Sequence, residues 1–74
     1  MKEEILSLLR YKDDNLFLGN IFVGQIYMST DNMWNMCYPT YTRGEFLHLG
    51  KEYSKGHAEL LLKEYIMKKI FREV

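Results

Sequence analysis

The sequence predicts an α+β domain with a short N-terminal helix, a three- to four-stranded antiparallel meander, and a C-terminal amphipathic helix packed on the sheet. Residues 54–73 hold the longest stretch of helical periodicity in the chain. The residues before them form short runs rich in β-branched and aromatic side chains, and turn signals separate these runs. A run of strands followed by a helix is typical of α+β folds. We therefore expect a single domain over residues 1–74.

The predicted C-terminal helix runs from Ser54 to Glu73 and carries two apolar stripes. One stripe has the spacing of a helix that lies on a core, and it consists of Ala58, Leu61, Leu62, Tyr65 and Ile66. The second stripe lies roughly opposite and consists of Leu60, Met67 and Phe71. Ser54 is the expected N-cap, with a start at His57 as the alternative because Gly56 weakens the first turn. Two interpretations of the second stripe stay open: the N-terminal segment folds back over it, or it is an interface with a second copy or a target.

The predicted N-terminal helix covers Lys2 to Lys12 and has one apolar side, formed by Ile5, Leu6, Leu8 and Leu9. A helix of this length is marginal in isolation, so we expect it to dock on the rest of the domain. Asp13, Asp14 and Asn15 follow as a turn signal.

The region from Leu16 to Ser29 is rich in strand-forming residues. Gly19 and Asn20 suit a two-residue hairpin turn, and the alternative is one long bent strand with a bulge at Gly19 or Gly24. Strict alternation after the turn predicts two sets of side chains on opposite faces, Phe22, Ile26 and Met28 against Ile21, Val23 and Tyr27. Neither set is polar, so we expect both sheet faces to be covered, one by the C-terminal helix and the other by the N-terminal helix or a partner.

The last part of the sheet is predicted to start after a turn at Thr30, Asp31 and Asn32. Met33 to Tyr38 reads as a strand with Trp34, Met36 and Tyr38 on one face, and Pro39 ends it because proline cannot donate to a ladder. Glu45 to Leu49 forms either a short fourth strand or an extended lead-in to the final helix.

Size, composition and charge limit the function classes. A core of this size rarely supplies more than about 3–5 kcal/mol of stability, yet 47% of the 74 residues are hydrophobic and 15% are aromatic. This composition fits either a dense aromatic core or a contact surface, since aromatic and Met side chains are enriched at interface centres.

Ten basic and ten acidic side chains give a net charge of zero, which is untypical of a dedicated nucleic-acid binder. The single cysteine fits a reducing cytoplasm, and no apolar run is long enough to span a membrane.

No motif carries a specific chemistry. Cys37 with His48 or His57 could be a nucleophile and base, but nothing in their spacing requires it. The same three residues lack the short paired spacing of structural zinc ligands. Gly19 and Gly24 have the spacing of a P-loop start, but Gln25-Ile26 stands where Lys-Ser/Thr is required. We therefore expect no enzyme activity, no catalytic residue, no metal and no cofactor.

The segment Gly19 to Ile26, followed by Trp34 in the next strand and Ala58 in the terminal helix, resembles short phage-encoded proteins of strand-strand-strand-helix type. The resemblance covers roughly residues 16–66 and transfers no site residue. It implies binding of a host protein, because members with assigned roles tend to bind and block host proteins, anti-CRISPR-like and other anti-defence inhibitors included.

The function expected from the sequence is non-enzymatic binding of a protein target, with homodimerisation. The expected contact surface combines the outer helical stripe with sheet aromatics: Leu60, Met67, Phe71, Tyr27 and Trp34. The alternative function is a small nucleic-acid-binding regulator, in which lysines of the final helix contact phosphates and sheet tyrosines stack on bases.

Overall fold

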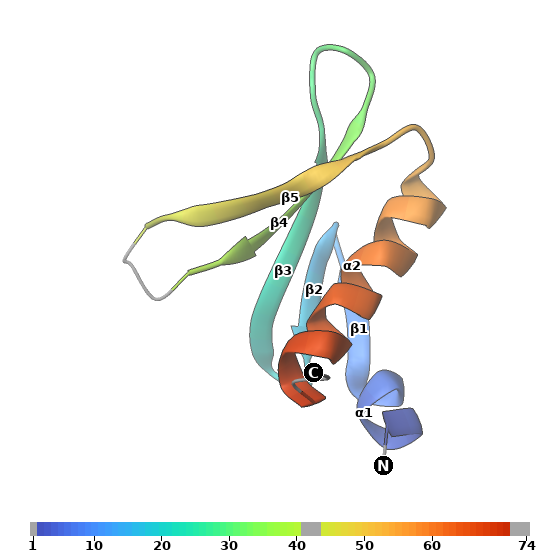
Figure 1. Cartoon of the computed structure of the whole chain (residues 1–74), viewed down its shortest axis with the longest axis vertical. Coiled ribbons are helices and arrows are strands. Elements are labelled where there is room, and N and C mark those ends of the chain that lie inside the picture. Colours follow the sequence, from blue (N-terminus) through green and yellow to red (C-terminus); the bar gives the residue numbers. More distant parts are fainter. Residues whose placement is uncertain (1, 41–43, 72–74) are drawn as a thin grey trace.

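The computed structural model describes residues 2–40 and 44–71, which form a five-stranded antiparallel sheet and two helices (Figure 1). The strands lie in chain order, and each pairs with the next. In chain order the elements are α1 (Lys2–Leu8), β1 (Leu9–Lys12), β2 (Asn15–Leu18), β3 (Ile21–Met28), β4 (Trp34–Pro39), β5 (Phe46–Glu52) and α2 (Lys55–Phe71). The predicted α+β meander is confirmed, with five strands in place of three or four.

The strand that the prediction missed, β1, comes from the end of the predicted N-terminal helix. Leu9 is buried and Tyr11 is half-buried, while Arg10 and Lys12 are exposed, and this alternation is that of a strand. Asp13 and Asp14 both have positive φ, 52° and 67°, as a tight hairpin turn requires. The turn joins β1 to β2, so the pairing with β2 overrides the helical periodicity over residues 9–12.

The other turns lie where the sequence predicts them. Gly19 and Asn20 form the hairpin between β2 and β3, with a φ of 61° at Gly19, so the alternative of a single bent strand is wrong. β4 ends at Pro39, and β5 confirms the strand interpretation of residues 45–49, extended to Glu52.

Two bulges interrupt the ladders. Leu16 pairs with Gly24 but Phe17 pairs with Phe22, so Val23 is an extra residue in β3. The prediction that Phe22 shares a face with Ile26 is therefore wrong, since the bulge reverses the alternation between them. Leu49 is the extra residue in β5, because Met36 pairs with Gly50 and Cys37 pairs with His48.

The core lies between α2 and one face of the sheet, with α2 running along the strands (Figure 1). It consists of Leu9, Leu16, Ile26, Met36, Ala58, Leu62 and Ile66. The first predicted stripe of α2 is confirmed, because Leu61 and Tyr65 pack against this cluster as well. The Ser54 hydroxyl accepts a hydrogen bond from the His57 amide at 3.3 Å, which confirms the predicted cap.

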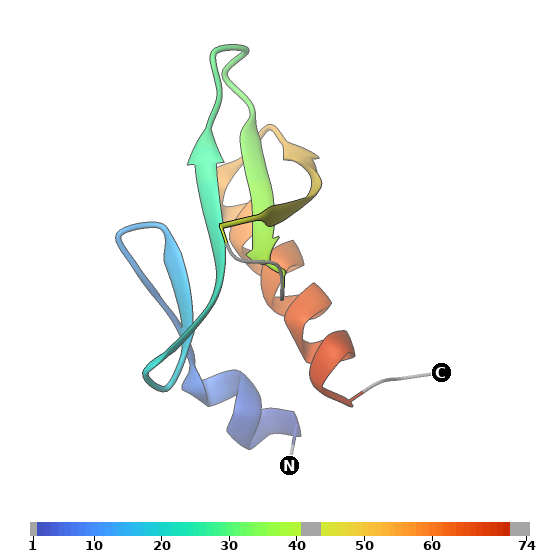
Figure 2. The same ribbon diagram turned by 90° about the vertical axis from the view of Figure 1, so that its left-hand side faces the viewer.

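The other face of the sheet, which we call the open face, has no helix over it within residues 2–40 and 44–71. Helix α1 lies at one end of the molecule, where it contacts α2, β1 and β2 (Figures 1 and 2). The prediction that the N-terminal helix or a partner covers the second face is thus wrong for the helix, because α1 is too short to reach across the sheet. Among the described residues no other helix covers this face, although Asn35 and Cys37 on it are buried within the sheet.

Candidate functional site

The structure separates the five residues predicted to form one contact surface. Tyr27 lies on the open face and is 42% exposed, whereas Trp34 lies on the opposite face, packed against the core with the Lys55 ammonium 5.4 Å from its ring centroid. On α2, Leu60 is 54% exposed, and Met67 is half-buried against the core cluster. The Phe71 side chain lies outside the described part of the structure. No single surface therefore joins Tyr27, Trp34 and Leu60.

The structure instead brings together a set of aromatic side chains on the open face, which we call the aromatic face and define as Phe17, Phe22, Tyr27 and Phe46. Phe17 and Phe22 are cross-strand partners, and their ring centroids lie 5.9 Å apart in an edge-to-face arrangement. Phe22 also contacts Phe46 of β5 edge to face, at 6.2 Å. Three strands thus contribute to one continuous row of rings.

The bulge in β3 explains why the sequence pattern did not reveal this row. Strict alternation places Phe22 with Ile26 on the core side, and only the extra residue Val23 turns Phe22 to the side of Phe17. In β5 the extra residue Leu49 packs on the core. The one local sign of the bulge in β3 is a glycine inside the strand, since Gly24 directly follows Val23.

A polar network fixes the strands beside this row. The buried Asn35 donates from Nδ2 to Ser29 Oγ at 2.8 Å, and its Oδ1 accepts from His48 Nε2 at 2.8 Å. Ser29 in turn donates to Asp31, whose other carboxylate oxygen lies 2.7 Å from Lys51 Nζ. The network therefore links the β3–β4 turn to β5 and orients His48 as a structural donor.

The carboxyl group of Asp31 is held in its charged form by this arrangement. The hydrogen bond from Lys51, with a further one from Ser29, lowers the pKa of Asp31 to about 2. The turn between β3 and β4 is consequently closed by an ion pair at neutral pH.

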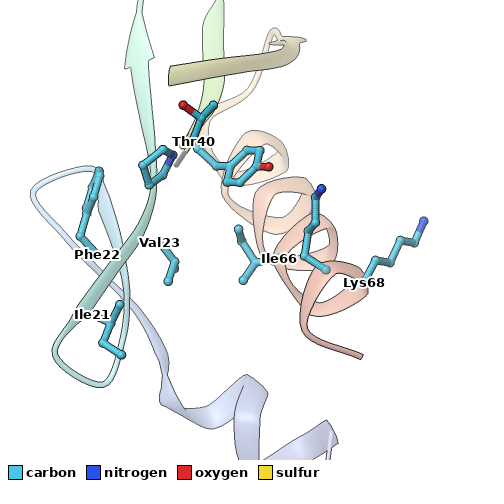
Figure 3. A pocket seen from close by; sticks show the side chains of 9 residues that line it. Ile21, Phe22, Val23, Thr40, Ile66 and Lys68 are labelled. Atoms are coloured by element: carbon cyan, nitrogen blue, oxygen red, sulfur yellow. The ribbon is translucent and has the colours of Figure 1, made fainter. Parts of the chain in front are cut away.

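A pocket of about 750 Å³ opens beside the aromatic face, between β3, the end of β4 and the second half of α2 (Figure 3). We call it the α2 pocket. Val23 and Ile66 point toward each other across it, and Phe22 points away to the other side of β3 (Figure 3). Its lining is Ile21, Phe22, Val23, Tyr38, Pro39, Thr40, Ile66, Lys68 and Lys69. The pocket therefore combines an apolar floor with the lysine side chains of one wall, of which Lys69 lies beside Tyr38 and Lys68 extends away from the pocket (Figure 3).

The lysine side chains of α2 have defined neighbours. Lys69 Nζ lies 5.4 Å from the ring centroid of Tyr38 and 5.6 Å from that of Tyr65, and hydrogen bonds to these two side chains raise the pKa of Lys69. Lys63 lies over the Tyr11 ring at 5.7 Å. Lys55 forms an ion pair with Asp14 at 3.0 Å. These contacts tie much of the positive charge of α2 to the sheet.

Cys37 and His48 are cross-strand partners, so the structure does bring together this pair, which the sequence analysis considered and set aside. The thiol is nevertheless buried, and this burial raises the pKa of Cys37 against the opposing effect of a hydrogen bond with Tyr27. A nucleophilic cysteine requires the reverse shift. His57 lies elsewhere, with its Nδ1 3.4 Å from a Glu52 carboxylate oxygen. Among the described residues, no three His, Cys, Asp or Glu side chains cluster as metal ligands would.

The described part of the chain contains no helix that is both long and apolar enough to cross a bilayer. Comparison with protein-family models, curated proteins and solved structures finds no match to this chain. The resemblance to short phage-encoded proteins accordingly stays a prediction from the sequence.

Proposed function

We propose that this protein is a non-enzymatic protein-binding module that uses the aromatic face and the adjoining α2 pocket. The single observation that carries the proposal is the row of rings on the open face, where Phe46 is 49% exposed. Aromatic side chains are enriched at the centres of protein interfaces, where they account for most of the binding energy. Their edge-to-face contacts hold the rings in place before a partner arrives, which lowers the entropic cost of binding.

The chemistry of the α2 pocket indicates the kind of partner. Ile21, Val23 and Ile66 offer an apolar floor for one buried anchor side chain of the partner. Lys69 lines the same pocket with its ammonium group beside Tyr38, so an Asp or Glu next to that anchor would be favoured. We therefore propose a partner surface with a protruding apolar side chain and a neighbouring carboxylate.

In its specific form, the proposal is that binding occludes a functional surface of a host protein in the cytoplasm, as in phage-type anti-defence inhibitors. The support for this form is the sequence resemblance together with the absence, among the described residues, of a metal-ligand cluster or an activated cysteine. Self-association into a homodimer remains part of the proposal, because a small domain gains stability from it.

The test compares matched variants in affinity capture from cells that naturally make the protein, followed by quantitative mass spectrometry. Phe17→Asp places a charge on the aromatic face, and Leu60→Asp places the same charge on the exposed side of α2. We expect a partner captured by the wild type to be retained by Leu60→Asp and lost by Phe17→Asp, both variants being folded by circular dichroism. Equal capture by Phe17→Asp and the wild type would exclude the aromatic face.

One observation favours the alternative of nucleic-acid binding. A groove of about 450 Å³ is lined by Arg10, Lys12 and Phe17, among other residues, and this combination can bind a phosphate and stack a base. Phosphate-driven binding weakens steeply as salt rises. A fluorescence titration with a single-stranded oligonucleotide at two salt concentrations tests this alternative, and Arg10→Gln should weaken binding if it holds. The lysines of α2 support it less, since Lys55 is paired with Asp14.

A further inference from the structure

Strand β5 is an edge strand, because it pairs only with β4 in the strand order. Its first three residues, Phe46, Leu47 and His48, are all exposed, and they precede the bulge at Leu49. An exposed apolar edge strand is a template for pairing with another strand.

The backbone groups on the free edge follow from the ladder with β4. The Thr40 amide donates to the Glu45 carbonyl at 3.2 Å, so these two residues form a hydrogen-bonded pair. Hydrogen-bonded and non-hydrogen-bonded pairs alternate along an antiparallel ladder. Leu47 therefore directs its amide and carbonyl toward β4. Phe46 and His48 direct theirs outward, to the free edge.

We propose that β5 pairs with β5 of a second copy in an antiparallel register centred on Leu47. In this register Phe46 faces His48 of the other copy, and the outward amide and carbonyl groups of both residues hydrogen-bond to each other. The pair closes on itself about a two-fold axis, as an isologous dimer requires.

Other registers fit this strand less well. Two neighbouring registers also place outward-directed backbone groups opposite each other. One is centred on Phe46, one residue toward Gly44, and the other is centred on His48, one residue toward Leu49. The first shift uses Gly44, which has a φ of 79° and lies in the turn. The second shift extends the ladder across the bulge at Leu49. Only the register centred on Leu47 lies wholly between the turn and the bulge. It also buries the exposed Leu47 against Leu47 of the second copy.

The consequence for the molecule is a ten-stranded sheet with its two open faces on the same side. A two-fold axis at Leu47 runs perpendicular to the sheet, so both α2 helices lie on the opposite side. The two Phe46 rings then lie near the axis and join the two aromatic faces into one surface. The self-pairing itself does not depend on the proposed target binding.

The first test measures mass by light scattering after size exclusion, from micromolar to submillimolar concentration. We expect the wild type and Leu47→Ile to form a dimer, and Leu47→Lys or Leu47→Glu to weaken it by at least about tenfold, because like charges would face each other at the axis. Mixing Leu47→Lys with Leu47→Glu should restore a dimer, observed by native mass spectrometry as the heterodimer. A wild type that stays monomeric, or a dimer that neither charge variant weakens, would overturn the proposal.

The second test uses Leu47→Cys under mild oxidation and does not depend on the charge variants folding. Cα atoms of directly opposed residues in a non-hydrogen-bonded pair lie about 4.5 Å apart, within the range of about 4.4–6.8 Å that a disulfide spans. We expect a covalent dimer from Leu47→Cys and none from Lys51→Cys, which lies beyond the bulge. Equal cross-linking at both positions, or none at Leu47→Cys, would contradict this register.

Discussion

A Cβ atom added to Gly24 would lie 3.0 Å from Leu62 Cδ2, so the absence of a side chain at Gly24 is what lets α2 lie this close to β3. Leu62 is fully buried, and the Cys37 carbonyl closes the other side at 3.3 Å. The bulge residue Val23 directly precedes this contact. One short stretch of β3 therefore determines two things. It sets how closely α2 packs on the sheet, and it directs the Phe22 side chain to the open face.

Gly24→Ala is expected to destabilise the protein by about 1–3 kcal/mol, because an added methyl group in a close-packed core forces its neighbours to shift. The measurement is urea denaturation followed by circular dichroism. In a double-mutant cycle with Leu62→Ala, the two losses should be less than additive, since removing Leu62 makes room for the methyl group. Additive losses would show that the two residues do not compete for this space.

Ser54→Ala is expected to cost about 1 kcal/mol of stability, because the Ser54 hydroxyl caps α2 through the His57 amide. Ser54→Asp serves as the control, since aspartate caps a helix about as well as serine. The same denaturation experiment gives both values. A loss in Ser54→Asp as large as that in Ser54→Ala would place the role of Ser54 elsewhere.

The ion pair of Asp31 with Lys51 predicts a specific response to acid. The pKa of Asp31 is lowered to about 2, below its unfolded value of about 3.9. A carboxyl group whose pKa is lower in the folded state than in the unfolded state stabilises the protein at any pH above its unfolded pKa. This stabilisation is lost as the pH falls through its folded pKa. Titration of the Asp31 side-chain carboxyl by NMR should show a midpoint near pH 2. In Lys51→Met the midpoint should move upward, and an unchanged midpoint would mean that Lys51 is not the cause.

Cys37 is expected to react slowly with thiol reagents in the native state. Its thiol is buried, and this burial raises the pKa of Cys37, so little thiolate is exposed to a reagent. Labelling followed by mass spectrometry should be slow in native buffer and fast in urea. Rapid labelling of the native protein at neutral pH would reopen the possibility that Cys37 and His48 act together.

The elements with strong local signals could be predicted from the sequence. The spacing of Ala58, Leu62 and Ile66 predicted which side of α2 lies on the core, and Gly19-Asn20 predicted the hairpin after β2. The strand β1 was missed because residues 9–12 continue the helical spacing of α1, and only pairing with β2 decides between helix and strand.

The aromatic face could not be predicted from alternation. A bulge adds one residue and moves every later side chain to the opposite face, and Gly24 indicates that a bulge can form here but not that Val23 is the extra residue. The residues expected from the sequence accordingly share only Tyr27 with the aromatic face that we propose, and Phe17, Phe22 and Phe46 were not among them. It also joined Trp34 to Tyr27, although these two residues lie on opposite faces of the sheet.

Site-specific photo-cross-linking tests the proposed contact surface most directly. A photoreactive phenylalanine analogue is introduced at Tyr27, on the aromatic face, and separately at Leu60, on the exposed side of α2, in cells that naturally make the protein. The account predicts a discrete cross-linked protein partner from position 27 and none from position 60. A partner cross-linked from position 60 and not from position 27 would contradict it.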